Sequence, residues 1–384
     1  ASCHRSVRGT LALGSAPVDG DLGDRAVSGA RPARPLPVAL VVAARPKQWI
    51  KNLLVFAAPG AAGVVDGSAA FAEAAGAFVC FCLAAAGTYY LNDAADVQAD
   101  RRHPTKRFRP IAAGEVSVPL ARVLGVVLIV ASVAAGAAID RHLAVVLACY
   151  VTLTTAYSTW LKHIAVVDVV AVAAGFVLRA IGGAAAVDVP ISNWFFIVAT
   201  FGSLFMVVGK RRAEVGEMGD EAATTRRSLS AYSPTFLAEL QTVSTAVVLV
   251  GYCLWAFEKA EVAGASVPWF QLSIVPFGLA ILRYALLVDS GHGGAPEDVV
   301  LQDRTLQVLG ALWAVLSLRA GVLGLIRASG WDAYAGVGGL APADLAGAVR
   351  SGILERADAW GAITWGVLLY VALEAIGCAT LGVR

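Results

Sequence analysis

Charged side chains are scarce in this chain of 384 residues, in which Asp, Glu, Lys and Arg together make up only 15%. Soluble domains have about 25% charged and about 45–50% apolar residues, whereas 58% of this chain is hydrophobic. The mean hydropathy is +0.70. This composition excludes an ordinary water-soluble domain and favours a protein whose solvent is lipid. The net charge is only +2, and we expect no nucleic-acid partner.

Several familiar signatures are also missing. The six cysteines include no CxxC pair, and all but Cys3 lie in apolar runs, so we expect neither a zinc site nor a disulfide framework. The chain contains no GxGxxG, no phosphate-binding loop ending in GK[ST], no HExxH and no GxSxG. Its five histidines form no ligand cluster along the sequence.

Long apolar runs dominate what is present. They cover 50–66, 71–91, 118–139, 142–161, 165–187, 193–209, 236–257, 268–289 and 306–326, with a last one near 360–382. Most approach the ~20 residues that cross the hydrocarbon core of a bilayer. Backbone groups in lipid must be paired within their own segment, so we expect helices. The sequence predicts an all-α integral membrane protein, a bundle of about nine transmembrane helices.

Three regions follow from these runs. Residues 1–40 are polar, lack the apolar core of a signal peptide, and are predicted to form a mobile cytoplasmic tail. Residues 41–328 form the predicted transmembrane catalytic domain. Residues 329–384 form a C-terminal extension whose apolar run is either a tenth span or a helix at the interface or in a homo-oligomer contact.

Basic residues gather in alternate loops. The loop after the second run has five basic residues within 101–109, and the loop after the sixth run begins with Lys210, Arg211 and Arg212. The loops at the opposite ends of the runs contain few basic residues. By the positive-inside rule, these basic loops face the cytoplasm. We therefore expect a multi-pass protein of the inner (plasma) membrane whose active site faces the cytoplasm and whose basic segments contact anionic lipid.

The sharpest motif is Asn92-Asp93-Ala-Ala-Asp96-Val-Gln-Ala-Asp100, at the end of the second run. Its carboxylates are spaced i, i+3, i+7, so a helix would present them on one face. Magnesium prefers oxygen ligands and usually bridges one or two carboxylates to substrate phosphates. The spacing favours a Mg²⁺ site, against the alternative of a solvated acidic helix end.

Cations and aromatic residues accompany this motif at other predicted span ends. They lie in Arg45–Asn52, in Tyr157–Lys162 and at the end of the sixth run. Cations around metal-binding carboxylates are typical of a diphosphate site, although membrane anchoring is the alternative for each residue alone. Arg179 and Arg283 lie inside apolar runs, where a cation usually faces a polar cavity or a partner.

The motif NDxxDxxxD at 92–100 resembles the first aspartate motif of the UbiA superfamily of intramembrane prenyltransferases, and the resemblance extends over about 40–326. It implies a helical bundle in which aspartates chelate Mg²⁺ on a diphosphate at the cytoplasmic mouth, beside a lateral opening for a lipid chain. The second family motif, DxxxD, has no counterpart, because Asp298 and Asp303 are wrongly spaced.

The missing second motif, the surplus of cations and the Arg45–Asn52 segment resemble one branch, the decaprenyl-phosphate phosphoribosyltransferases. This resemblance implies transfer of 5-phosphoribose from phosphoribosyl diphosphate (PRPP) to decaprenyl or another polyprenyl phosphate, for arabinan and arabinogalactan in cell-wall biogenesis. Asp93, Asp96 and Asp100 would act in catalysis by holding Mg²⁺. Implied substrate-binding residues are Lys47, Lys51, Asn52, Asn92, Arg101, Lys106, Arg109, Tyr157, Lys162, Asp168, Arg179, Lys210 and Arg211.

Which cation binds which phosphate group is left open. Two other functions are also open. One is a prenyltransferase that uses prenyl diphosphate and an aromatic or lipid acceptor. The other is a transporter.

Overall fold

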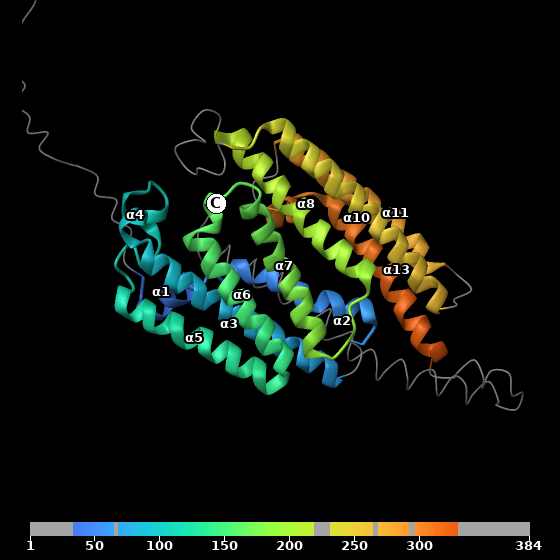
Figure 1. Cartoon of the computed structure of the whole chain (residues 1–384), viewed down its shortest axis with the longest axis horizontal. Coiled ribbons are helices and arrows are strands. Elements are labelled where there is room, and N and C mark those ends of the chain that lie inside the picture. Colours follow the sequence, from blue (N-terminus) through green and yellow to red (C-terminus); the bar gives the residue numbers. More distant parts are fainter. Residues whose placement is uncertain (1–33, 65–67, 219–230, 264–267, 292–295, 329–384) are drawn as a thin grey trace, which may run out of the picture.

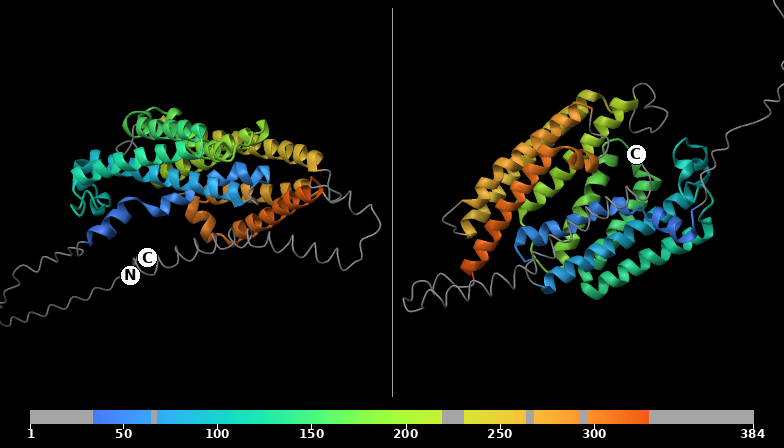
Figure 2. Two further views of the ribbon diagram at one scale, coloured as in Figure 1. Left: turned by 90° about the horizontal axis from the view of Figure 1, so that it is seen from below. Right: turned by 180° about the vertical axis from the view of Figure 1, so that it is seen from behind.

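The computed structural model describes residues 34–64, 68–218, 231–263, 268–291 and 296–328, and in this part of the chain all regular secondary structure is helical. The long helices lie side by side in all views (Figures 1 and 2). The predicted C-terminal extension and most of the predicted N-terminal tail lie outside the described residues. The tail prediction overlaps the first helix, which begins at Leu36.

Seven of the described helices are long and apolar enough to cross a membrane, which confirms a multi-pass membrane protein. These helices are α3 (Ser68–Ala95), α5 (Val118–Ile139), α6 (Arg141–Thr159), α7 (Val167–Ala186), α8 (Asn193–Met218), α10 (Pro234–Ala263) and α11 (Trp269–Asp289). The ninth predicted run is α13 (Arg304–Ala328), which packs along α11. Shorter helices are α1 (Leu36–Ala43), α2 (Ala57–Ala62), α4 (Val97–Arg102), η2 (Lys106–Phe108), η3 (Leu161–His163) and α12 (Pro296–Gln302).

The first predicted run is not one regular α-helix. It consists of the 3₁₀ helix η1 (Pro46–Phe56) followed by the short helix α2. A 3₁₀ helix rises about 2.0 Å per residue, so the lengths of the two segments add up to roughly 31 Å, which is comparable with the thickness of the hydrocarbon core. Such long 3₁₀ segments are uncommon, and irregular backbone is tolerated at membrane depth where protein surrounds it. Here η1 packs against α3 and α7.

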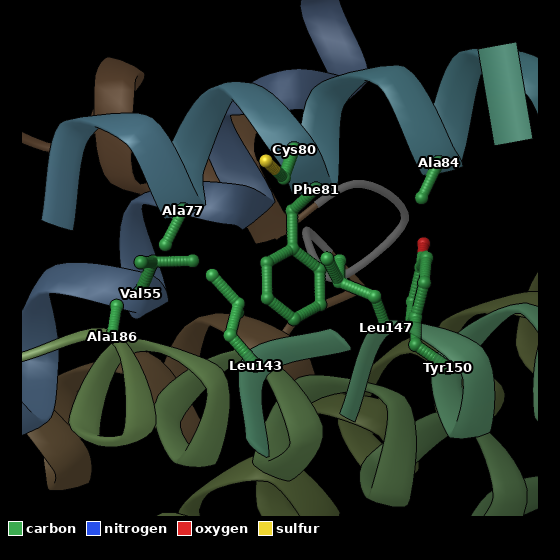
Figure 3. Packing of buried hydrophobic residues seen from close by; sticks show 9 residues of the cluster. All are labelled: Val55, Ala77, Cys80, Phe81, Ala84, Leu143, Leu147, Tyr150 and Ala186. Carbon is green, nitrogen blue, oxygen red and sulfur yellow. The ribbon is translucent and has the colours of Figure 1, made fainter. Parts of the chain in front are cut away.

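A glycine makes this close packing feasible. A Cβ atom built on Gly183 of α7 would lie 1.7 Å from the carbonyl oxygen of Val55 on η1. Any side chain would therefore collide with backbone, which cannot rotate away. Figure 3 shows the apolar cluster at this junction, in which Phe81 of α3 points towards Leu143 and Leu147 of α6.

The bundle has two sides. On one side α3 packs on α5 and α6, and on the other α8, α10, α11 and α13 lie together, with α7 in contact with both α6 and α8 (Figure 1). Large apolar side chains are exposed on the outer faces, including Val123, Val127 and Val130 of α5 and Leu279 and Leu282 of α11. Exposed apolar surface of this extent is expected of helices that face lipid.

Candidate active site

A cavity of about 1400 Å³ lies between the two sides of the bundle. One part of its wall is polar and is formed by η1, the end of α3, the end of α6 and the end of α8. Another part is aromatic and includes Tyr252, Trp255, Phe270, Phe277 and Trp313. The cavity can therefore hold a molecule with both a charged and an apolar portion.

The aspartate motif spans a bend in the chain. Asp93 lies in the last turn of α3, Asp96 separates α3 from α4 with φ −89° and ψ 5°, and Asp100 lies in α4. Asp93 and Asp100 are almost completely buried, with exposed fractions of 2% and 4%, and do not line the cavity. Asp96 lines the cavity together with Asn92, whose Nδ2 lies 3.4 Å from an Asp96 carboxylate oxygen.

Two arginines occupy the space around the buried carboxylates. Arg45 Nη2 lies 2.5 Å from Asp93 Oδ1, and Arg109 Nη1 lies 3.2 Å from the same oxygen. The same Arg109 nitrogen lies 2.7 Å from Asp100 Oδ2. Both arginines line the cavity. Asp93 and Asp100 thus fix two guanidinium groups at the cavity wall.

These contacts bear on the predicted metal site. In the described part of the chain, no three His, Cys, Asp or Glu residues are grouped so as to hold a metal ion. A protein needs only one or two carboxylates to bind Mg²⁺ when substrate phosphates and water supply the other ligands. Asp96 fits that requirement because its carboxylate faces the cavity. Asp93 and Asp100, in contrast, each contact an arginine.

Arg45 was not among the predicted site residues. It has left-handed backbone angles (φ 54°, ψ 60°) immediately before Pro46, and its guanidinium lies 4.7 Å from the centre of the Tyr89 ring. The sequence signal that could have identified it is its place at the start of the basic and aromatic segment that leads into η1.

A second cluster lies where α6, α7 and α8 meet. Arg211 of α8 donates to the Tyr157 hydroxyl (3.1 Å), pairs with Glu214, and has its Nε 3.2 Å from Asp168 Oδ2. Tyr157, Arg211 and Glu214 line the cavity, whereas Asp168 is fully buried behind them. Asp168 therefore holds a cation at the wall, as Asp93 does.

Tyr232 completes this cluster and was missed by the sequence prediction. Its hydroxyl donates to Asp168 Oδ1 (2.5 Å) and accepts from the backbone N–H of Val166 (2.6 Å). Burial raises the pKa of Tyr232, and the hydrogen bond to Asp168 raises it further, so the hydroxyl stays protonated and donates. Val166 has φ +69°, a conformation that a β-branched residue rarely adopts. The tyrosine thus fixes the turn that joins Lys162 to α7.

The structure brings most predicted site residues to one cavity. Those that line it are Lys51, Asn92, Asp96, Lys106, Arg109, Tyr157, Lys162, Arg179, Lys210 and Arg211. Asn52 is fully buried behind the wall, where it accepts a hydrogen bond from Arg179. Lys47 is exposed, and Arg101 donates to the Ala112 carbonyl (3.1 Å), both away from the cavity lining. Arg283 pairs with Asp303 (2.7 Å).

Residues 53–302 match the UbiA prenyltransferase family. The chain is 45% identical to a decaprenyl-phosphate phosphoribosyltransferase of Corynebacterium glutamicum, over 74% of this chain and 86% of the relative. It is 46% identical to the protein of the same name from Mycobacterium tuberculosis H37Rv, over 74% and 94%.

Solved structures give the same fold. A UbiA homolog from Archaeoglobus fulgidus bound to GPP and Mg²⁺ superposes with a TM-score of 0.58 at 18% identity, over 74% of this chain and 99% of that chain. Another similar structure is that of a digeranylgeranylglyceryl phosphate synthase, with a TM-score of 0.54 at 13% identity, over 76% of this chain and 99% of that chain.

Proposed function

The chain belongs to the UbiA prenyltransferase family, and we propose that it transfers 5-phosphoribose from PRPP to decaprenyl phosphate or a similar polyprenyl phosphate. Relatives at 45–46% identity that are aligned over 86–94% of their length carry the corresponding name. The proposed product would feed the arabinan of a cell wall. The proposed place is the inner (plasma) membrane, with the polar end of the cavity open to the cytoplasm, because the basic loops lie at that end.

The observation that carries the proposal is the imbalance of charge around the cavity. Nine basic side chains line it, against two acidic ones, Asp96 and Glu214, in the described part of the chain. Eight of these basic residues are Arg45, Lys51, Lys106, Arg109, Lys162, Arg179, Lys210 and Arg211, and the ninth, Lys259, lies near the C-terminal end of α10, away from the basic loops. A single diphosphate held by a metal would not need so many cations. Two phosphorylated substrates that must approach each other would need a larger number of cations around them.

We infer that Mg²⁺ takes part through Asp96, with Asn92 beside it. When bound, the ion would neutralise part of the charge on the donor diphosphate. The arginines held by Asp93, Asp100 and Asp168 would contact other phosphate oxygens, for which guanidinium groups are well suited. Because these arginines are already fixed by buried carboxylates, little reorganisation is needed when charge develops on the leaving group.

The transfer needs no protein base. The bond between C1 of the ribose and the diphosphate oxygen breaks, and its electrons leave with the diphosphate. An oxygen of the acceptor phosphate forms the new bond to C1. The second pKa of a phosphate monoester is about 6, so the acceptor phosphate is already ionised at neutral pH. The chain must therefore mainly hold two anions in the right orientation, which is the task that the basic wall can perform.

Product formation tests the proposal directly. Purified protein in detergent is incubated with PRPP labelled in the ribose, decaprenyl phosphate and Mg²⁺, and label is measured in the organic phase. With the wild-type protein we expect label in the lipid fraction. The label should disappear when EDTA is added and in the Asp96→Asn variant. The Arg283→Gln variant, which changes a cation away from the cavity, should still label the lipid. Consumption of prenyl diphosphate with no transfer from PRPP would instead establish the prenyltransferase alternative.

A further inference from the structure

Arg179 is a buried cation whose hydrogen-bond partners are all neutral. Its Nε donates to Asn52 Oδ1 (2.7 Å), its Nη1 to the Gly175 carbonyl (2.7 Å) and its Nη2 to the Tyr150 hydroxyl (2.8 Å). The residue is 7% exposed, and no carboxylate of the described residues pairs with it. A guanidinium has five N–H groups, so donors remain beyond these three bonds.

Other buried or half-buried arginines of the described residues have carboxylate partners. Arg211 lies beside Asp168 and Glu214, and Arg283 lies beside Asp303. A charge taken out of water without an opposite charge is costly, and cations inside a membrane protein usually pair or face a polar cavity. Arg179 has no such pair, but it does line the cavity. The counter-charge is therefore expected from a ligand.

Neutral groups hold the guanidinium in place. Asn52 is fully buried, its amide donates to Cys82 Sγ (3.2 Å), and it belongs to η1, whose close approach to α7 depends on Gly183. The guanidinium carbon also lies 4.7 Å from the centre of the Tyr150 ring. These contacts fix the orientation of the cation without placing an opposite charge beside it.

The depth of Arg179 indicates which substrate it meets. It lies about three helical turns, or roughly 16 Å, beyond Asp168 along α7. Its hydrogen bond to the Gly175 carbonyl directs the guanidinium about one turn back along the helix, towards the charged end. On α10, Gln241 marks the charged level through its bond to Arg212 (2.6 Å), and aromatic Tyr252 follows about three turns deeper. Arg179 thus lies where the charged wall gives way to the aromatic wall.

We propose that Arg179 binds the phosphate of the polyprenyl phosphate acceptor, an inference that rests on the proposed function. The acceptor is the substrate that joins one phosphate to a long apolar chain, so its phosphate belongs at this boundary. The donor is polar along its whole length, and the cations nearer the mouth, Lys106, Arg109 and Arg211 among them, suit it better.

Equilibrium binding of two lipids isolates the contribution of the phosphate. The probes are decaprenyl phosphate and decaprenol, which share the same chain, and the quantity is the ratio of their dissociation constants. We expect Arg179→Gln to reduce the preference for the phosphate by roughly tenfold to a hundredfold, the range for a hydrogen bond between charged groups. The affinity for PRPP should not change.

Asn52→Asp provides an independent variant, because it places a carboxylate of the same shape at the atom that lies 2.7 Å from Arg179 Nε. An internal ion pair should then compete with the lipid phosphate and lower the same ratio, even if Arg179→Gln fails to fold. Arg283→Gln is the matched control and should keep the wild-type ratio. Product formation by the wild-type protein tests the proposed function separately.

An unchanged ratio in a folded Arg179→Gln, or a loss of PRPP affinity in its place, would overturn the assignment. The same holds if Asn52→Asp folds and retains the full preference for the phosphate.

Discussion

Replacing Gly183 with alanine should separate η1 from α7 and damage both stability and turnover. The added Cβ would lie 1.7 Å from the Val55 carbonyl oxygen, whereas real Cβ atoms essentially never come within 3.0 Å of another heavy atom. The two backbones would have to move apart by roughly 1.3 Å or more. Overpacking of a core typically costs about 1–3 kcal/mol, and a clash with backbone belongs at the upper end.

The shift would displace Asn52 and Lys51, which η1 carries, from Arg179 and the cavity. We expect the melting temperature in detergent to fall by roughly 5 °C or more, and transfer from PRPP to fall at temperatures where the protein is still folded. Gly278→Ala is the matched control, since its Cβ would meet a leucine methyl group at 3.7 Å, an ordinary contact. Equal melting temperatures and activities for the two variants would refute the argument that Gly183 sets the position of η1.

Four other variants test the roles of particular side chains. Asp96→Asn should abolish turnover with little change in melting temperature. Asp93→Asn should lower both turnover and melting temperature, because Arg45 and Arg109 lose a carboxylate partner. Equal losses of melting temperature in the two variants would contradict this distinction. Tyr232→Phe should raise the KM for PRPP several-fold through the turn that carries a cavity lysine, and an unchanged KM would argue for a purely structural tyrosine. The hydrogen bond from Arg283 and, to a smaller extent, one from a backbone N–H lower the pKa of Asp303. The stability that the ionised Asp303 contributes is therefore present at neutral pH and is lost as the pH falls through that lowered pKa. The melting curves of wild type and Asp303→Asn should therefore differ at neutral pH and converge in acid, and a constant gap would disprove the pairing.

The spans were predictable because the length and apolar character of a run are properties of the sequence alone. Each of the nine predicted runs corresponds to a described element, from η1 with α2 to α13. The close packing of the first run was not predictable, because its approach to α7 requires a glycine far along the chain, Gly183. Local sequence cannot express a contact of that kind.

The site was predictable where a motif places residues close together. The aspartate motif pointed to Asn92 and Asp96, which line the cavity wall, but the helical spacing could not show the bend at Asp96. Basic loops were harder to interpret, since membrane topology and substrate binding call for the same residues. Lys106 lines the cavity and Lys47 does not, and nothing in their local sequence separates them.

The charges of the site are arranged in two layers. This arrangement explains why the sequence motif alone does not show which of its aspartates would contact a metal ion. Buried carboxylates, Asp93, Asp100 and Asp168, lie behind the wall, and the arginines that they hold lie in it. An isolated cation beside an apolar cavity would be desolvated at a high cost, and a paired one less so. The carboxylates therefore allow cations to gather at one surface without unfolding it. On this argument an aspartate of the motif can be essential to turnover without touching a metal ion, because its loss would release an arginine that we propose to bind substrate phosphate.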